Sequence, residues 1–287
     1  MAKPAGVKKT ILAVLAHPDD ESFGMGGTLA YYSSKGVDVH LICATRGEAG
    51  TVDEEFLTKH KSIAKLREAE LRCAARTLGL ASVIFLDYRD SGMAGSKDNH
   101  HRKALMNASS EKAAAQIVAH IRRLRPQVVI TFDPVGGYHH PDHIAIHKAT
   151  VRAFRSAGDR KQFPGSGKPF QPEKLYYNAL NRQRLRWIVR IMRLTGKDPS
   201  RVGRNKDIDL TRLARDKDTP PHVEINYRAV EERKHKADAC HASQLDGRFS
   251  RLSLLELYWR LVGHRDRFTR AVPPTPDHYR AKDLFAD

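Results

Sequence analysis

ILAVLAHPDDE, residues 11–21, is the stretch of this 287-residue sequence that decides its fold. Its first six residues are apolar, and its last five are polar or charged apart from one proline. Such an apolar run is typical of a strand buried on both faces, as in a parallel sheet covered by helices. Ligands of such sheets bind beyond the carboxyl ends of the strands. The stretch therefore predicts a buried first strand with a polar cluster where ligands bind.

Strand-like and helix-like segments alternate through the rest of the first half of the chain. Further strands are expected at 37–45, 82–87, 127–132 and 175–180, and helices at 24–36, 59–78, 108–124 and 143–157. Apolar strands separated by helices favour a parallel sheet covered on both faces. We therefore predict an α/β fold, a Rossmann-like three-layer sandwich with a mostly parallel sheet and a smaller C-terminal lobe.

The sequence changes character after residue 180. A basic amphipathic helix is expected at 182–193, a strand at 222–227, and helices at 230–242 and 252–262, whereas the polar segment 198–221 has no firm assignment. We predict two parts: a Rossmann-like catalytic core at 1–180, and a C-terminal α/β extension at 181–287 that completes the active site.

The composition indicates a globular chain with a large positive charge. Hydrophobic residues make up 40% of the sequence, and no stretch approaches the roughly 20 apolar residues of a membrane span. Lys8 and Lys9 resemble the start of a signal peptide, but no small-residue cleavage site follows, so we predict a cytoplasmic protein. The formal net charge is +17, which suits an anionic partner or simply solubility.

The three cysteines, Cys43, Cys73 and Cys240, are far apart and show no CxxC spacing. Free cysteines are usually small buried hydrophobes. We therefore predict buried thiols, with neither a disulfide framework nor a cysteine metal site.

A second polar cluster, GGYHHPDH at 136–143, follows the strand expected at 127–132. Both clusters come after buried strands, so both lie at one edge of the sheet, and neighbouring central strands would place them face to face. Two imidazoles and a carboxylate, with a fourth position open, are typical of a catalytic zinc site. A spare carboxylate can act as general base and a spare imidazole can stabilise an oxyanion. This combination favours hydrolysis of an amide or an ester.

The sequence resembles the LmbE-like, or PIG-L, family of zinc N-deacetylases over nearly its whole length. The family's (A/P)HPDDE motif matches Ala16 to Glu21, and its HPDH motif matches His140 to His143. Further matches are TRGE at 45–48, LREAE at 66–70, RDSGM at 89–93, and the segment from Lys236 through HASQ at 241–244.

The resemblance implies a metal site and a base. His17, Asp20 and His143 match the zinc ligands, although Fe(II) or Co(II) can accept the same ligands. Asp19 matches the general base that takes a proton from the metal-bound water. The alternative for Asp19 is that it only forms hydrogen bonds to the residues that bind the metal.

The second motif implies three more catalytic residues. His140 matches the residue that stabilises the tetrahedral intermediate, and Asp142 the one that orients and charges it. Tyr138 matches a mobile tyrosine that touches the substrate carbonyl, with a packed loop tyrosine as the alternative. His139, where mycothiol-type members usually have glycine, is expected at the rim of the site.

The substrate-binding positions implied by the resemblance are Glu48, Arg67, Asp90 and His241. The role of His241 is the least defined of these. Arg67 and Glu70 lie three residues apart on a predicted helix, and for Glu70 a simple surface pair is the favoured interpretation. Gly24 to Gly27 lacks GxGxxG spacing, so a nucleotide site is disfavoured. That run is similar to bacillithiol-type members, whereas 89–93 is similar to mycothiol-type ones, so the substrate stays open.

We therefore predict a metal-dependent hydrolase that removes the N-acetyl group from a GlcNAc-type amino sugar or glycoconjugate. The alternative is an amidase that cleaves thiol-sugar conjugates on the same metal site, and a basic polyanion-binding module is a more distant one. The expected partner is a small amino sugar, and no nucleic acid is expected. The basic helix at 182–194 is either a solvated face or a surface for an anionic partner, and a homo-oligomer is left open.

Overall fold

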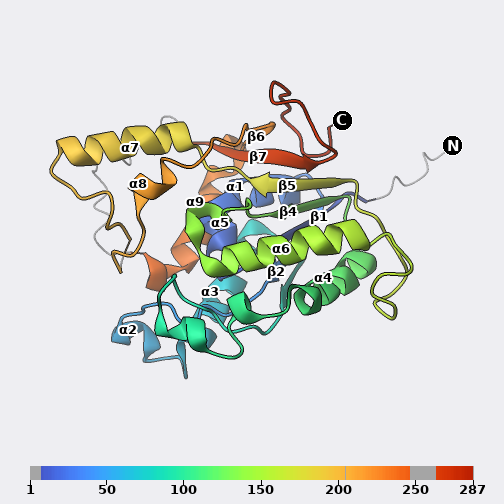
Figure 1. Ribbon diagram of the computed structural model, residues 1–287, viewed down its shortest axis with the longest axis horizontal. Coiled ribbons are helices and arrows are strands. Elements are labelled where there is room, and N and C mark those ends of the chain that lie inside the picture. Colours follow the sequence, from blue (N-terminus) through green and yellow to red (C-terminus); the bar gives the residue numbers. More distant parts are fainter. Residues whose placement is uncertain (1–7, 204, 246–262, 287) are drawn as a thin grey trace.

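The computed structural model describes residues 8–203, 205–245 and 263–286. A seven-stranded sheet in the order β3-β2-β1-β4-β5-β7-β6 runs through these residues (Figure 1). Neighbours among β1 to β5 are parallel, and β7 is antiparallel to both β5 and β6, which confirms the mostly parallel sheet. The strands are β1 (Thr10–Leu15), β2 (Asp38–Cys43), β3 (Ser82–Phe85), β4 (Val128–Thr131), β5 (Lys174–Asn178), β6 (Val223–Asn226) and β7 (Arg265–Val272).

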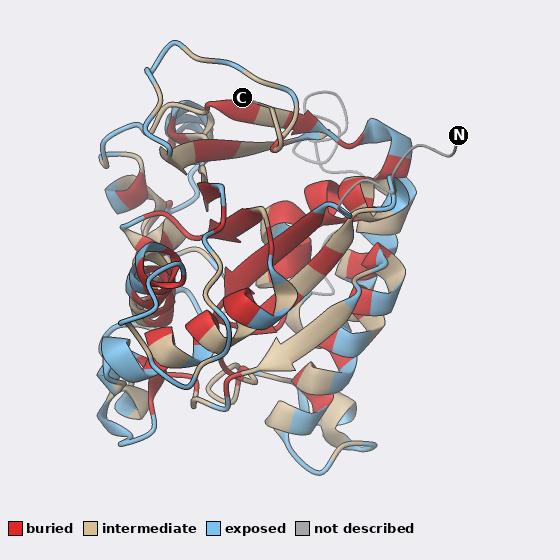
Figure 2. Cartoon of the chain, turned by 90° about the vertical axis from the view of Figure 1, so that its right-hand side faces the viewer, coloured by how far each residue is buried: buried red, intermediate tan, exposed pale blue. Residues whose placement is uncertain are grey.

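Helices cover both faces of this sheet, which gives the predicted three layers. α4 and α6 pack together on one face, and α1, α3 and α9 pack together on the other (Figure 1). Figure 2 shows buried strands between helices whose outer sides are exposed. No helix in the described ranges is long and apolar enough to cross a membrane. The helices are α1 (Asp20–Ser34), α2 (Glu54–Leu57), α3 (Ile63–Leu78), α4 (Ser110–Leu124), α5 (Gly136–His139), α6 (Pro141–Ser156), α7 (Arg182–Leu194), α8 (Leu210–Leu213) and α9 (Glu231–Cys240).

The first strand is central, as its apolar run predicts. All six residues of β1 are buried, with β2 on one side and β4 on the other. Because β1 and β4 are parallel neighbours, the segments that follow them leave the sheet side by side. The two polar clusters therefore face each other, as expected from sequence.

The glycines of the first helix serve close packing. α1 already begins at Asp20, four residues before the predicted start. A Cβ on Gly27 would lie only 2.1 Å from Cγ of Tyr227, whereas one on Gly26 would meet its nearest neighbour at 3.4 Å. Gly27 therefore lets the segment after β6 approach α1.

The C-terminal part extends the same sheet. β6 confirms the strand predicted at 222–227, and β7 is a strand that the sequence analysis missed. The helix predicted at 252–262 lies outside the described residues. The division of the chain at residue 180 stays a prediction.

The prediction of three unpaired cysteines is wrong for two of them. Cys73 in α3 and Cys240 at the end of α9 form a disulfide, with Cα atoms 5.8 Å apart. Only the packing of α3 against α9 brings together residues 167 positions apart in the sequence. Cys43 is free and buried, as predicted.

Candidate active site

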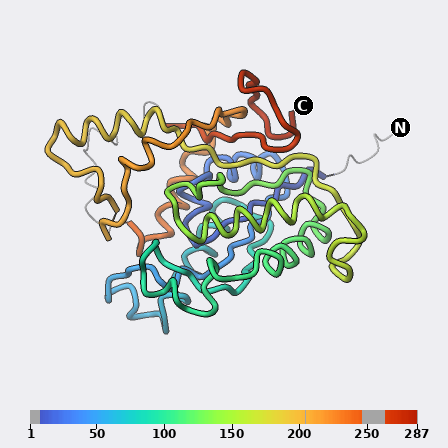
Figure 3. The backbone as a smooth tube through the Cα atoms, viewed as in Figure 1, coloured from blue at the N-terminus to red at the C-terminus, as the bar shows by residue number. Residues whose placement is uncertain are grey.

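The candidate site lies at the carboxyl edge of the sheet. Segments distant in sequence gather there, at the left-hand end of Figure 3, including blue, green and orange parts of the chain. Directly after β1, Asp20 opens α1 and its Oδ2 accepts the N–H of His17 at 2.7 Å. Asp19 lies between them with φ of 112°, a left-handed conformation that costs a non-glycine residue free energy. Such outliers concentrate at functional sites because the surroundings hold them in place.

The second cluster opens α6. The Nδ1 of His140 accepts the N–H of Asp142 at 3.2 Å, which makes His140 the N-cap, and Pro141 occupies the first helical position. Proline is favoured there because its fixed φ suits the helix and because an N–H at the first helical position would have no acceptor within the helix. Three residues after His140, His143 is almost fully buried against Phe132, with the ring centroids 3.8 Å apart.

The side chains of three residues that can bind a metal, His17, Asp20 and His143, converge between the two clusters. The Nδ1 of His17 lies 3.2 Å from the Nε2 of His143. Asp20 lies 3.3 Å from His143 Nε2 through Oδ1, and 3.6 Å from His17 Nδ1 through Oδ2. Bonds of about 2.0–2.1 Å to a tetrahedral zinc ion place neighbouring ligand atoms about 3.3 Å apart. The spacing and the donor types therefore fit a metal ion.

Two further groupings of potential ligands share His17. His140 lies close enough to join His17 and His143, and Asp90 and Asp142 also gather around His17. The Nε2 of His17 is 3.2 Å from Asp142 Oδ2 and 3.4 Å from Asp90 Oδ1. A metal-bound histidine usually gives its other ring nitrogen to a carboxylate. This contact leaves Nδ1 of His17 for a metal.

Asp19 stands beside these atoms with a cationic neighbour. Its Oδ2 accepts a hydrogen bond from Nη2 of Arg67 at 3.0 Å. Burial raises the pKa of Asp19 to about 7, although the Arg67 guanidinium opposes that rise. A carboxyl group with this pKa can accept and return a proton near neutral pH.

Arg67 and Glu70 are buried, so the interpretation of Glu70 as a member of a surface pair is wrong. Arg67 also donates to the carbonyl of Pro18, and its Nε lies 3.7 Å from Glu70. Glu70 accepts the backbone N–H and the hydroxyl of Ser243, each at 2.8 Å. The LREAE motif of α3 thus contacts both the Asp19 loop and the segment after α9.

His140 is held as a neutral donor. Burial lowers its pKa, and the neighbouring His17 and His143 lower it further. Because its Nδ1 accepts the N–H of Asp142, the proton of the neutral ring belongs on Nε2. His140 can therefore donate a hydrogen bond to a developing negative charge.

The Asp142 carboxylate is placed differently from its predicted role. It contacts His17, and it accepts hydrogen bonds from the backbone N–H of Ser91 at 2.8 Å and from the Ser91 hydroxyl. Its contact with His140 runs through the backbone N–H. Asp142 thus orients His140 by its main chain and His17 by its side chain, a division that residue spacing could not reveal.

Tyr138 lies over the histidines. Its ring centroid is 5.0 Å from that of His143 and 5.8 Å from that of His140. The preceding Gly137 has φ of 66°, and its N–H donates to Asp133 at 2.7 Å. Burial raises the pKa of the Tyr138 phenol, so its hydroxyl stays protonated at neutral pH.

The ring of His139 contacts the carboxylate of Asp216. Its Nε2 lies 2.9 Å from Oδ2 of Asp216, which also receives Arg182 at 3.1 Å. Its ring is about one-fifth exposed. These contacts agree with a rim position.

Two of the predicted substrate positions, Glu48 and Asp90, lie together. The Glu48 carboxylate accepts the N–H of Asp90 at 3.1 Å, and Asp90 accepts the N–H groups of Ala49 and Gly92. The loops after β2 and β3 are thereby tied to each other beside His17.

His241, the fourth predicted substrate position, is fully buried. Its Nε2 lies 2.7 Å from Glu21 Oε1, and Glu21 Oε2 accepts the N–H of Asp19 at 3.0 Å. His241 was predicted to contact the substrate, but in the structure it binds Glu21 and is linked through Glu21 to the Asp19 loop. Glu21 and Ser91 are site residues that were not predicted from the sequence, although Glu21 lies in the HPDDE motif and Ser91 in the RDSGM motif.

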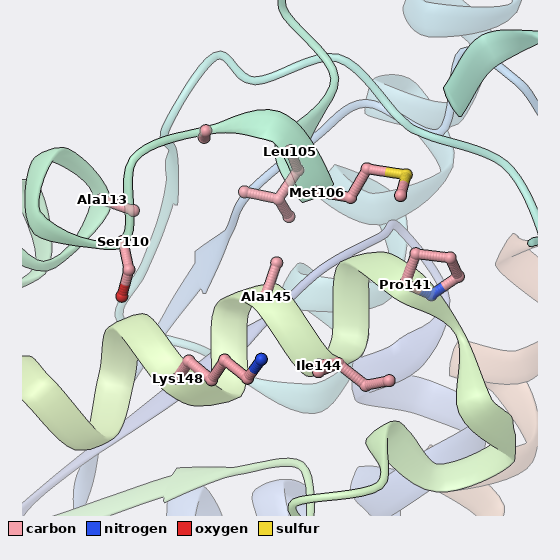
Figure 4. Close-up of a pocket in the computed structure, with 9 residues that line it drawn as sticks. Leu105, Met106, Ser110, Ala113, Pro141, Ile144, Ala145 and Lys148 are labelled. Atoms are coloured by element: carbon pink, nitrogen blue, oxygen red, sulfur yellow. The ribbon is translucent and has the colours of Figure 1, made fainter. Parts of the chain in front are cut away.

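An open cavity of about 420 Å³ borders the site on the outer side of α6. Figure 4 shows Pro141 and Ala145 of α6 facing Leu105 and Met106 across it. The N–H of Met106 donates to the Ser91 hydroxyl at 3.1 Å, so the wall of this cavity is joined to the network around Asp142. Its lining is largely apolar, with Lys148 as the charged member.

The mostly parallel sheet and the converging histidines and carboxylates define an α/β protein with a hydrolase site able to hold a metal ion. The PIG-L family model, described as GlcNAc-PI de-N-acetylase, matches residues 12–154, and the chain belongs to this family of de-N-acetylases.

Two curated relatives carry one name, 1D-myo-inositol 2-acetamido-2-deoxy-alpha-D-glucopyranoside deacetylase. The one from Rhodococcus jostii is 37% identical, over 83% of this chain and 82% of its own length. The one from Geodermatophilus obscurus is 36% identical, over 97% of each chain.

Solved structures support the fold alone. An N,N'-diacetylchitobiose deacetylase from Pyrococcus horikoshii matches with a TM-score of 0.63 and 20% identity, covering 93% of this chain and 85% of its own. The 4-carboxy-2-hydroxymuconate hydratase GalB of Pseudomonas putida matches with a TM-score of 0.59 and 20% identity, covering 93% and 98%. Because one of these proteins is a deacetylase and the other a hydratase, the shared fold does not determine the reaction.

Proposed function

We propose that this chain is a zinc-dependent deacetylase that removes the acetyl group from N-acetylglucosamine linked to inositol, releasing acetate and a free amine. The observation that carries the proposal is the convergence of His17 Nδ1, Asp20 and His143 Nε2 beside the partly buried carboxyl group of Asp19.

His17, Asp20 and His143 would hold the metal. When bound there, zinc would lower the pKa of a coordinated water toward 7 and polarise the amide carbonyl. The carboxylates of Asp90 and Asp142 at the other ring nitrogen keep His17 oriented.

Asp19 is the general base. Its carboxylate accepts a proton from the attacking water as the new C–O bond forms at the amide carbon. A pKa of about 7 also lets the protonated Asp19 deliver that proton to the leaving nitrogen. The C–N bond then breaks and acetate leaves. Water and amide together supply every atom of the two products.

His140 stabilises the oxyanion of the tetrahedral intermediate. Its Nε2–H donor is preorganised because the main chain of Asp142 fixes Nδ1. Removing one such donor from an enzyme typically costs about 100-fold to 1000-fold in rate. The protonated hydroxyl of Tyr138, above the histidine rings, is a second donor for the same oxygen.

The sugar would lie against the loops of Glu48 and Asp90. Carboxylates are well suited to accept hydrogen bonds from sugar hydroxyls. An inositol aglycone is supported by the shared name of the relatives from Rhodococcus jostii and Geodermatophilus obscurus. We assign Arg67 to Asp19 rather than to the sugar, because its side chain is 4% exposed and already donates to Asp19 and to the carbonyl of Pro18.

Acetate release tests this proposal. The chain is stripped with a chelator, reloaded with Zn(II), Fe(II) or Co(II), and assayed on GlcNAc-inositol, GlcNAc-malate and free GlcNAc. We expect no acetate from the stripped chain and the highest kcat/KM for GlcNAc-inositol. Equal rates on all three sugars would contradict the inositol assignment. Cleavage of an acylated thiol-sugar conjugate without acetate release would identify an amidase instead.

A further inference from the structure

Helix α7 exposes an apolar stripe. Trp187, Ile191 and Leu194 are 59%, 49% and 79% exposed, the highest values for large apolar side chains in the described ranges. Their spacing of four and three residues places them on one side of the helix. Exposed apolar side chains that gather on one element mark a surface for an apolar partner.

The opposite side of α7 is fixed to the body of the protein. Leu185 and Val189 are buried, and Arg182 is bound to Asp133 and Asp216 at 3.1 Å each. Asp133 also accepts the N–H of Gly137, the residue before Tyr138, so α7 is tied to the wall of the candidate active site. The exposed stripe therefore belongs to a helix that is packed on the body of the protein.

Arginines flank the stripe. A cavity of about 520 Å³ lies between α7 and α8. Four arginines line it, Arg186, Arg190, Arg193 and Arg215, together with Val189, Leu194, Thr211 and Ala214. Arg186 pairs with Asp218. The other three have no carboxylate partner among the residues that the structure describes. This cavity can hold an anionic group such as a phosphate.

The apolar stripe and the arginines beside it together indicate which kind of partner α7 binds. A second copy of α7 would bring arginines against arginines in a chain of net charge +17, which is repulsive. Nucleic acid would satisfy the arginines but leave Ile191 and Leu194 in water. A phospholipid surface offers both phosphates and an apolar phase, and tryptophan favours the boundary between them.

We propose that α7, together with α8, docks the protein on a bilayer that carries anionic phospholipids. The arginine-lined cavity takes lipid phosphates, and Trp187, Ile191 and Leu194 enter the interface. α7 follows β5 closely and stands at the same end of the molecule as the candidate active site (Figure 1). Docking would thus bring that edge of the sheet near the membrane surface.

Vesicle co-sedimentation of the full chain tests the proposal, with light scattering of the unbound chain for its oligomeric state. Vesicles of phosphatidylcholine alone are compared with vesicles containing 30% phosphatidylglycerol. We expect binding at least about tenfold tighter to the anionic vesicles, because several arginines face the surface. Binding should weaken as salt is raised.

Two double variants separate the contributions. Trp187→Ser with Leu194→Ser should lower vesicle affinity about tenfold or more, and Arg190→Glu with Arg193→Glu should abolish the preference for anionic vesicles. Arg160→Glu with Lys168→Glu makes the same charge change on exposed residues of another loop and should retain most of the binding. Circular dichroism and thermal unfolding verify that each variant is folded.

Four outcomes would overturn the proposal. The first is a chain that stays in the supernatant with anionic vesicles. The second is full binding by the Trp187→Ser, Leu194→Ser variant, and the third is equal loss of binding in the control variant. The last is binding to single-stranded DNA or self-association through α7 in place of vesicle binding.

Discussion

The guanidinium of Arg67 lies 3.0 Å from the carboxylate of Asp19; the Arg67 side chain is buried and the Asp19 side chain is partly buried. Burial raises the pKa of Asp19 to about 7, and Arg67 keeps it from rising further. The cation therefore sets the pH at which the proposed base becomes available. Without it, the buried carboxyl group would stay protonated at neutral pH.

Replacing Arg67 should move the pH dependence of the reaction. In Arg67→Met the carboxylate loses its cationic neighbour, so the pKa of Asp19 rises. The acid limb of kcat/KM should then shift upward by roughly one pH unit or more. Activity should fall more at pH 6.5 than at pH 8.5. Arg67→Lys, which keeps the charge, should shift less. An unchanged acid limb in Arg67→Met, with KM alone increased, would instead indicate a sugar-binding role.

The buried pair of Glu21 and His241 should matter for stability. His241→Ala leaves the Glu21 carboxylate without its imidazole partner, at a cost of about 3–5 kcal/mol in the free energy of unfolding. Glu21→Gln with His241→Gln should cost less than the two single changes added together, because no unpaired charge remains. Urea denaturation measures these values. A loss below about 1 kcal/mol in His241→Ala, with KM raised, would favour the substrate contact predicted from sequence.

Adjacent glycines in α1 offer a matched comparison. Gly27→Ala forces a methyl group into the ring of Tyr227 and should destabilise the fold by about 1–3 kcal/mol. Gly26→Ala meets only ordinary contacts and should be neutral or slightly stabilising, because alanine favours the helix. Thermal unfolding of both variants tests this difference. Equal melting temperatures would show that α1 does not pack against Tyr227 as described.

The disulfide between Cys73 and Cys240 should stabilise the chain. A link between residues this far apart in sequence restricts the unfolded state, and such links typically contribute about 2–4 kcal/mol. Reductant should lower the denaturation midpoint of the native chain by the corresponding amount. Cys73→Ser with Cys240→Ser should already have the lower midpoint and not respond to reductant. Alkylation of both thiols without prior reduction would contradict the disulfide.

The sequence could predict the sheet and the meeting of the two polar clusters, because both follow from strand burial and strand adjacency. Hydrophobic periodicity and sequence motifs predict β1 and β4, and the parallel fold then predicts that these strands are neighbours. Periodicity and motifs do not predict contacts between helices that are distant in the sequence. The Cys73–Cys240 disulfide and the Glu70–Ser243 hydrogen bonds both depend on α9 lying against α3.

Side-chain direction was also beyond the sequence. The HPDH motif identifies Asp142, but only the position of Ser91 shows that its carboxylate turns toward His17. The LREAE motif identifies Arg67, but its contact with Asp19 depends on the left-handed backbone at that residue. In both cases the motif gave the participating residue and the tertiary structure gave its partner.

Metal content and turnover of Asp19→Asn, measured on the same sample, test the proposed mechanism most directly. The amide keeps the size of the carboxylate but cannot accept a proton, and His17, Asp20 and His143 remain in place to bind zinc. We predict close to one zinc ion per chain, as in the native protein, with acetate release from GlcNAc-inositol lowered by about 100-fold or more. Acetate release at the native rate, with zinc retained, would contradict Asp19 as the base.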